Sequence, residues 1–535
     1  MSRLQALEDS MLTGLGISTA RGLVCAVLAG GFLATGAHAQ TAAPAPAPAT
    51  DGDFFARLVK AYADELGPPA APDPNAPASR RAAPFPPSPV NTPPQPFTEW
   101  PFGGATTIGA TLPASIDSPL MTALAPTELG QALADAHVQI YGWVEPGGNV
   151  STSSRRKGGN APADYGYDPN TAWLDQAVVV FERLPDTVQQ DHVDWGFRVS
   201  PLYGADYRYT TAYGLWSNQL QKSNAQSGFD VMMAYGELYI PGIAQGLIIR
   251  AGRFSAVPDI ESQFAPYNYM YSHSMMYGVV NSTNTGVLGS LLLTNELMVQ
   301  FGITDGSDTM PWMAGSNRYV GGVNTTYPPR DPGVQPSFTA CIRYETASAD
   351  DAVYGCLNGI NNGAWGYNNL QEYAVTYYHK FNERWHFSAE AWDIHQNGVP
   401  NANYTGANPS PNIFAALANA PYLAQCAGQR ATCRAEAYAA VGFLNYQIGP
   451  MDNLTLRLEF LNDQDGQRTG YRTRYLNSAI GWQHWLSPTI TLRPEIALYN
   501  SLDAKAFNAS PAGGAISPAT ARTELVGAMD VIWHF

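Results

Sequence analysis

The sequence predicts an all-β protein, a transmembrane antiparallel up-and-down β-barrel of about 14 strands (about 12–16), with short periplasmic turns and long extracellular loops. Three observations predict it. Apolar and polar residues alternate along many runs of strand length, the connectors alternate between short and long, and no apolar run after the N-terminus is long enough for a spanning helix. Hydrocarbon admits only helices and closed barrels, because every backbone polar group must be paired within the protein.

Residues 1–39 are predicted to be a secretory signal peptide. Arg21 precedes the apolar run GLVCAVLAGGFLATG, and Ala37-His38-Ala39 has the small-x-small pattern of a cleavage site. A membrane anchor helix is the alternative, but the run is well short of the about 20 apolar residues that a spanning helix needs. We therefore expect the protein to be exported.

Residues 40–136 are predicted to be a periplasmic segment rich in proline and alanine, a composition that favours extended polyproline geometry and cannot bury a core. Inside it, DFFARLVKAYADELG places Phe54, Leu58 and Tyr62 at helical spacing, so we expect a short helix near residues 53–66. This helix would either bind a periplasmic partner or pack on the mouth of the barrel.

Composition and motifs exclude several classes of function. The chain is 14% charged and has 50 glycines and 41 prolines, which disfavours a helical bundle. The formal net charge of −15 argues against nucleic acid as a partner. Walker, HExxH and nucleophile-elbow motifs are missing from the sequence, so we expect no enzyme, no cofactor and no metal. An outer-membrane hydrolase with scattered catalytic residues is the alternative.

Residues 137–535 carry the predicted barrel. Runs of period two there are near the about 9–11 residues that cross a bilayer when tilted. These runs begin near Val138, Ala172, Val193, Asp230, Leu247, Thr285, Leu297, Leu370, Trp385, Glu436, Asn453, Thr473, Thr489 and Thr523.

The connectors between the runs alternate in length. The short ones lie at 241–246, 294–296, 382–384, 449–452 and 486–488. The long ones lie at 151–171, 204–229, 255–284, 305–369 and 397–435, with shorter ones at 464–472 and 501–522. Strict alternation along antiparallel strands places all turns at one rim and all loops at the other.

An even number of cysteines after the leader suggests disulfides in an exported chain. The four are Cys341, Cys356, Cys426 and Cys433. Proximity in sequence favours Cys341 with Cys356 and Cys426 with Cys433, each pair inside a long loop that faces an oxidising exterior. A metal site is the alternative, but no CxxC spacing or nearby histidine supports it.

The run LTLRLEFLN, residues 454–462, shows how the two faces of a strand are assigned. Leu456 and Leu458 share one face, while Arg457 and Glu459 share the other. An arginine in lipid at the bilayer midplane would cost ~2–4 kcal/mol, so Arg457 is expected to point inward. The same sorting gives the hypothetical pore-lining set: Arg198, Glu237, Arg250, Glu372, Glu390, Arg457, Glu459, Arg493 and Glu495.

An interior with both arginine and glutamate must be wet or fully paired, because unpaired buried charge is costly. We expect an aqueous pore with a mixed-charge lumen. The alternative is a plugged structural or adhesive barrel that acts through its long extracellular loops. Arg253 stays unassigned, because Arg250 and Arg253 in GLIIRAGRF cannot both point inward without a bulge or a rim position for one of them.

The chain ends on the run TELVGAMDVIWHF, which reads as a last barrel strand with an apolar face up to Trp533 and Phe535. We expect these two aromatic residues to be the C-terminal signal that the barrel assembly machinery reads.

The stretch GLIIRAGRFSAVPDIES and the following residues to Asp308 resemble the OmpL-like β-barrel porin family of Gram-negative outer membranes. The matching elements are the AGRF strand end, the P-x-x-E-S after it, the TGVLGS strand and the FGITDG exit into a loop. IYGWVEPGGN and the late LRPE extend the resemblance over most of the chain after Val138.

This resemblance implies a channel in the bacterial outer membrane that passes small hydrophilic solutes by diffusion and has no catalytic site. The expected partners are outer-membrane lipid, the barrel assembly machinery and the solutes themselves, and a homo-oligomer is left open. The family supplies no ligand residues to transfer.

Overall fold

A computed structural model describes residues 53–64, 80, 108–110, 118–154, 157–221, 223–256, 259–313, 333–366, 369–404, 423–509 and 518–535. The predicted signal peptide, residues 1–39, lies outside the described residues.

Antiparallel strands form one closed barrel in which consecutive strands pair and β1 closes the ring against β16. The strands are β1 (Gln139–Ser151), β2 (Ala172–Arg183), β3 (Asp194–Gly204), β4 (Gly228–Ile240), β5 (Leu247–Ser255), β6 (Thr283–Leu292), β7 (Leu297–Ser307), β8 (Ser337–Glu345), β9 (Asp351–Ile360), β10 (Gln371–Lys380), β11 (Trp385–Pro400), β12 (Thr432–Gly449), β13 (Asp452–Asp463), β14 (Thr473–Ser487), β15 (Ile490–Asn500) and β16 (Thr523–His534). The predicted all-β up-and-down barrel is confirmed, with 16 strands in place of about 14.

The two additional strands are β8 and β9, which lie inside the stretch predicted as one long loop, 305–369. β8 alternates clearly, with Phe338 and Ile342 exposed and Arg343 buried. β9 contains two glycines and a less regular pattern of burial, which weakens the period of two. The alternation of β8, together with the short turn at 346–350, could therefore have predicted this pair of strands.

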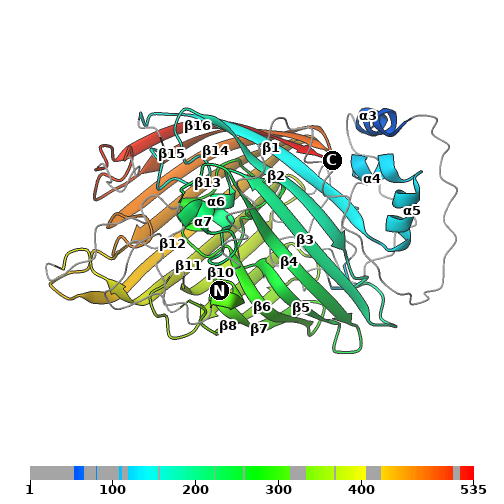
Figure 1. Ribbon diagram of the computed structural model, residues 1–535, viewed down its shortest axis with the longest axis horizontal. Helices are drawn as coiled ribbons and strands as arrows, with labels where there is room; N and C mark the ends of the chain where they lie inside the picture. The colour runs from blue at the N-terminus through cyan, green and yellow to red at the C-terminus, as the bar shows by residue number, and fades with distance from the viewer. Residues whose placement is uncertain are drawn as a thin grey trace, which may run out of the picture. The chain divides into compact units, whose positions relative to one another are not determined.

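Consecutive strands are antiparallel, so the connectors alternate between the two ends of the barrel. The shortest connectors share one end and the longest share the other (Figure 1). We call these the turn end and the loop end. Connectors at the turn end include residues 241–246 and 488–489, and connectors at the loop end include residues 152–171 and 501–522.

Side chains alternate across the barrel wall. On β13, Arg457 is 1% exposed, whereas the adjacent Leu458 is 55% exposed. On β5, Arg250 and Arg253 are both buried. The backbone of Gly252 has φ +136°, a conformation open to glycine, and it shifts the alternation by one residue. Arg253, which the sequence pattern left unassigned, therefore points inward.

One disulfide lies in the barrel wall. It joins Cys341 of β8 to Cys356 of β9, which stand directly opposite each other in the strand register. Cys341 is buried on the inner side of β8. The expectation that this pair sits in an exposed loop is wrong, because residues 305–369 contain the β8–β9 hairpin.

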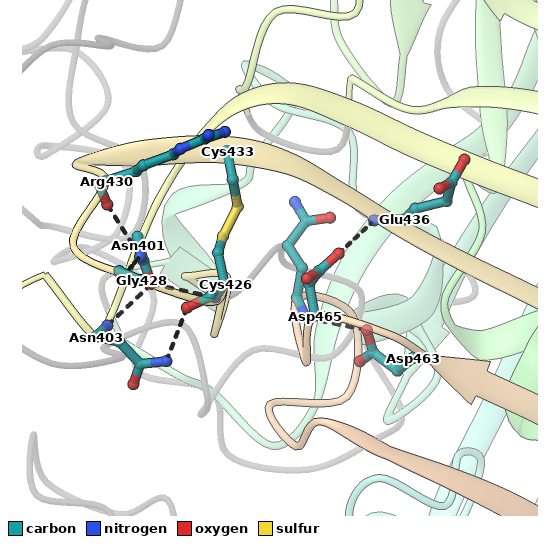
Figure 2. Close-up of a disulfide and its surroundings, with 10 residues drawn as sticks. Asn401, Asn403, Cys426, Gly428, Arg430, Cys433, Glu436, Asp463 and Asp465 are labelled. Carbon is teal, nitrogen blue, oxygen red and sulfur yellow. Dashed lines mark hydrogen bonds between the residues drawn. A yellow bond between two sulfur atoms is a disulfide. The ribbon is translucent and has the colours of Figure 1, made fainter.

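The second disulfide joins Cys426, in the loop between β11 and β12, to Cys433 of β12 itself (Figure 2). The buried Asn401 side chain fastens the same loop. Its amide donates hydrogen bonds to the carbonyl oxygens of Arg430 at 2.9 Å and Gly428 at 3.3 Å. Its own oxygen accepts from the backbone N–H of Cys426 at 3.2 Å. Covalent and amide contacts thus hold this segment to the wall.

Three helices precede β1 and lie beyond the end of the barrel at which the C-terminus is found (Figure 1): α3 (Phe54–Asp64), α4 (Pro119–Leu124) and α5 (Glu128–Asp135). The Tyr62 hydroxyl donates to the carbonyl of His534 at 2.7 Å, and its ring packs edge-on against Trp533. Arg57 donates to the carbonyl of Ala123 at 2.9 Å, which ties α3 to α4. Within the described residues, no helix combines the length and the apolarity needed to cross a membrane.

We predict that Leu458→Arg destabilises the barrel by ~2–4 kcal/mol, because the new charge would stand on the outer face of β13, where hydrocarbon is expected. Urea titration of the protein folded into lipid vesicles measures this free energy of unfolding. The control is Leu502→Arg in the loop between β15 and β16, where the charge stays in water and costs less than about 0.5 kcal/mol. Equal losses in the two variants would contradict the assignment of the outer face.

Candidate functional site

The described part of the loop between β5 and β6 that runs from residue 259 to residue 282 folds into the barrel, and we call it the internal loop. It contains the short helices η3 (Ala265–Tyr267) and α8 (Met275–Gly278). Every residue from 260 to 284 is buried. A loop at the mouth of a barrel would present one face to water, so this burial places the segment within the lumen.

Arg493 of β15 holds the first half of the internal loop. Its guanidinium donates to the carbonyl oxygens of Ala265 and Met270, each at 2.8 Å. It also pairs with Asp530 of β16 and, at 3.1 Å, with Glu145 of β1. The planar guanidinium offers several donors in a fixed geometry, which lets one side chain bind two carboxylates and the main chain together.

Residues of β13 and β15 hold the middle of the internal loop at Ser272. Arg457 donates to the Ser272 carbonyl at 2.7 Å and to its hydroxyl at 3.0 Å. Glu495 accepts from the Ser272 backbone N–H at 3.1 Å. Four residues later, Glu459 accepts from the N–H of Met276 at 2.6 Å. The positively charged Arg457 and the negatively charged Glu495 and Glu459 thus bind backbone groups of the internal loop, which need partners when they are buried.

The internal loop also reaches the wall elsewhere. Gln176 of β2 donates to the carbonyl of Gln263 at 2.7 Å, and Tyr271 donates to Asp175 of β2 at 3.0 Å. Glu390 of β11 accepts from the N–H of Ile260 at 2.9 Å. A loop that starts at β5 and returns at β6 therefore contacts β2, β11, β13 and β15. In a closed ring of 16 strands β13 lies opposite β5, so the internal loop crosses the lumen.

All nine residues of the hypothetical pore-lining set are buried on the inner face of the barrel. The structure brings five of them together against the internal loop: Glu390, Arg457, Glu459, Arg493 and Glu495. The other four are engaged elsewhere on the wall: Arg198, Glu237, Arg250 and Glu372.

Those wall residues form cross-strand contacts between neighbouring strands. Arg198 of β3 pairs with Glu182 of β2, and Arg250 of β5 pairs with Glu237 of β4, each directly opposite in register. The Arg250 guanidinium also lies 4.0 Å from the ring centroid of Tyr235. Directly opposed charges neutralise each other, which explains how buried arginines are tolerated in this part of the wall.

The hypothetical pore-lining set omits several charged residues at the internal loop. Glu145 and Asp530 lie on strands, and the alternation of β16 places Asp530 inward, so Asp530 was within reach of the argument used for Arg457. Asp164 and Glu261 lie in loops, where residues follow no period of two, so no sequence pattern could locate them.

Glu261 is the buried carboxyl of the internal loop itself. It accepts hydrogen bonds from the Ser274 backbone N–H at 2.9 Å and from the Ser274 hydroxyl. Burial raises the pKa of Glu261 to about 7, although the Arg457 charge and the two hydrogen bonds lower it. Its charge therefore changes near neutral pH.

Stacked aromatic rings join the internal loop to two neighbouring loops. The ring of Tyr165, from the loop between β1 and β2, stacks on His273 with centroids 3.6 Å apart and on Tyr209 at 4.1 Å. His273 stacks in turn on Tyr277 at 4.9 Å. Burial holds the pKa of His273 well below its ordinary value, so this ring is neutral at physiological pH.

The site consists of charged and hydrogen-bonding side chains on the inner face of the barrel. In the part of the chain that the structure describes, no group of three or more His, Cys, Asp or Glu side chains could hold a metal ion. Glu390 and Glu459 accept hydrogen bonds from backbone N–H groups of the internal loop, and Asp530 pairs with Arg493, so these three carboxylates help to position the loop.

A closed antiparallel barrel that turns its charged side chains inward around an internal loop belongs to the class of channel-type transmembrane barrels. Residues 137–535 match the family described as "Putative beta-barrel porin-2, OmpL-like", and the chain belongs to this family. The resemblance read from the sequence is thus confirmed. No curated protein matches the chain.

Solved structures with a similar fold include an anion-selective porin from Comamonas acidovorans, 9% identical with a TM-score of 0.44, with 74% of this chain and 99% of that chain covered. The outer membrane channel DcaP of Acinetobacter baumannii is 11% identical with a TM-score of 0.44, covering 74% and 97%. OmpT of Vibrio cholerae is 11% identical with a TM-score of 0.41, covering 74% and 97%.

We predict that Arg493→Met destabilises the protein by about 3–5 kcal/mol, because it leaves Asp530 and Glu145 as buried charges without their partner. Thermal or urea unfolding in detergent measures the loss. The control is Arg522→Met, since Arg522 is an exposed residue that donates to loop carbonyls and should cost less than about 1 kcal/mol. A loss for Arg493→Met no larger than that of the control would show that the guanidinium does not hold the internal loop.

We predict that Glu261→Gln stabilises the protein more at pH 8 than at pH 5. The pKa of Glu261 rises from 4.5 to about 7 on folding, so the folded state binds the proton more tightly, and the wild type loses stability as pH rises through this window. The glutamine variant has no such loss, so its free energy of unfolding exceeds that of the wild type by about 3 kcal/mol at pH 8. Charged groups facing Glu261 are Arg457, Glu459, Asp164, Asp259 and Glu390. Urea unfolding at both pH values tests it, and an equal difference at both would refute the assigned pKa.

Proposed function

We propose that this protein is a channel of the bacterial outer membrane that lets small hydrophilic solutes diffuse through its lumen. The observation that carries the proposal is a wide barrel with a charged internal loop fixed across it. Barrels of sixteen strands are wide enough to leave an aqueous path, whereas barrels of eight are filled by side chains. The internal loop narrows such a path.

The residues of the hypothetical pore-lining set would act on solutes through charge rather than chemistry. Arg457, Glu459, Arg493 and Glu495 position the internal loop, and the paired Arg198 and Arg250 neutralise the wall beside it. Uncharged hydroxyl and amide groups occupy much of the remaining inner face, with Thr376, Ser388, Asn445 and Thr455 among them. A mixture of this kind suits hydrophilic solutes and favours a channel over an enzyme.

At the end of the chain, Trp533 faces outward and is exposed, and the N–H of Phe535 donates to the carbonyl of Gly142 at 2.9 Å. Phe535 thus lies at the seam between the last strand and the first. This position supports the proposal that Trp533 and Phe535 are read by the barrel assembly machinery while the seam is still open.

A plugged barrel that acts through its loops is the second candidate, and the burial of residues 260–284 favours it. The two candidates differ in conductance. A plugged barrel passes no steady current, and it would conduct once the internal loop is shortened.

We predict that the purified wild-type protein conducts in planar bilayers, and that replacing residues 263–281 by a short glycine-serine linker raises single-channel conductance at least about twofold, because the segment crossing the lumen is gone. Heat-modifiability on gels controls for folding of the shortened variant. Conductance seen only in the shortened variant would favour the plugged barrel. Lack of current in both would refute the channel.

A further inference from the structure

The barrel interior and the loops folded over it carry more acid than base. Among the buried residues that the structure describes are 17 aspartates and glutamates, eight arginines and no lysine. Ionised carboxyls in this excess give the interior a negative electrostatic potential.

The eight arginines offset only part of this excess at the internal loop, and one of them, Arg208, donates to the carbonyl of Ala225 in the loop between β3 and β4. Five are committed to ion pairs in the wall: Arg198 with Glu182, Arg250 with Glu237, Arg253 with Asp230, Arg343 with Glu345 and Arg493 with Asp530. Arg457 and Arg468 instead donate to main-chain carbonyl oxygens of the internal loop, at Ser272 and Val279, over 2.7 and 2.8 Å. Their charges also act on Glu261 and on Asp164, respectively, so these two arginines offset part of the acid at the internal loop.

Five carboxyls gather at the internal loop. Two belong to the loop itself, and the others come from the loop between β1 and β2, from β11 and from β13. We call them the acidic group: Asp164, Asp259, Glu261, Glu390 and Glu459. Asp164 interacts electrostatically with both Glu261 and Glu459, and Asp259 interacts with Glu390. These interactions are between carboxyls, and each ionised carboxylate raises the cost of ionising its neighbours. Arg457 acts on Glu261 and Arg468 acts on Asp164 in the opposite direction, but here two arginines face five carboxyls.

A second observation at the same place concerns buried polar atoms that have no hydrogen-bond partner within the protein. One carboxylate oxygen of Asp164 is buried and accepts no hydrogen bond, and the hydroxyls of Tyr165 and Tyr277 lack a partner as well. Asp164 lies against Gly278, where an added Cβ would stand 1.6 Å from that carboxylate oxygen. The absence of a side chain at Gly278 thus makes room for the carboxylate. Water or a passing cation would satisfy these polar atoms.

We infer that the lumen passes inorganic and small organic cations in preference to anions, and that the acidic group sets this preference. The inference rests on the channel function proposed above. Carboxylates in a narrow passage repel anions and attract cations, as rings of Asp and Glu do in cation channels.

The test is the reversal potential of the full chain in planar bilayers under a KCl gradient. The KCl concentration on the dilute side is about 0.1 M, where the Debye length is about 10 Å and fixed charges act only at short range. Measured at pH 8, the wild type should pass potassium over chloride by at least about threefold. Glu261→Gln and Asp164→Asn should each reduce this ratio, and the pair together should reduce it further. The matched control is Asp64→Asn, the same change of charge on exposed α3 outside the barrel, which should leave the ratio unchanged.

A conducting wild type that shows no preference or prefers chloride overturns the inference while the channel function stands. Wild type without any conductance overturns both. If the ratio is high but neither variant lowers it, the acidic group does not set the preference. If gels show that the variants do not fold, the wild type is measured at pH 5.5 as well as at pH 8. Protonation of the acidic group at pH 5.5 should lower the potassium preference of the wild type. An unchanged ratio would count against the inference.

Discussion

The pairing of backbone N–H and C=O groups is the constraint on which the rest of this structure depends. Hydrocarbon supplies no partner for them, so the sheet must close, and here it closes where β1 meets β16. Phe535 and Gly142 exchange backbone hydrogen bonds in both directions at that seam. Closure in turn fixes which side chains face the lumen, because residues along each strand alternate between the two faces of the wall.

Charge inside the barrel is the second consequence of closure. Arginines and carboxylates excluded from the outer face must find partners within, and they do so in two ways. On β2 to β5 they pair across neighbouring strands, as Arg198 does with Glu182. On β13 and β15 they bind the internal loop, as Arg457 and Arg493 do. The first arrangement neutralises charge, and the second uses charge to fix polypeptide across the lumen.

The sequence was sufficient for the barrel, the two rims and the inward position of residues such as Arg457 and Glu495, because a strand period of two repeats over many runs. The sequence was insufficient for β9, whose glycines obscure that period. Because that strand was missed, Cys341 was expected in a loop and not in the barrel wall. The path of the internal loop could not be predicted either. Its position depends on contacts such as Glu390 with Ile260, between residues 130 positions apart, and no local pattern encodes them.

The disulfide between Cys341 and Cys356 ties together two strands that otherwise carry a weak pattern. A slip of one residue between β8 and β9 would turn Arg343 toward lipid, and the covalent link forbids it. Oxidation of these thiols before membrane insertion would deliver one hairpin already locked in alignment. Biogenesis of the protein would then depend on the thiol-oxidising capacity of the compartment that it crosses.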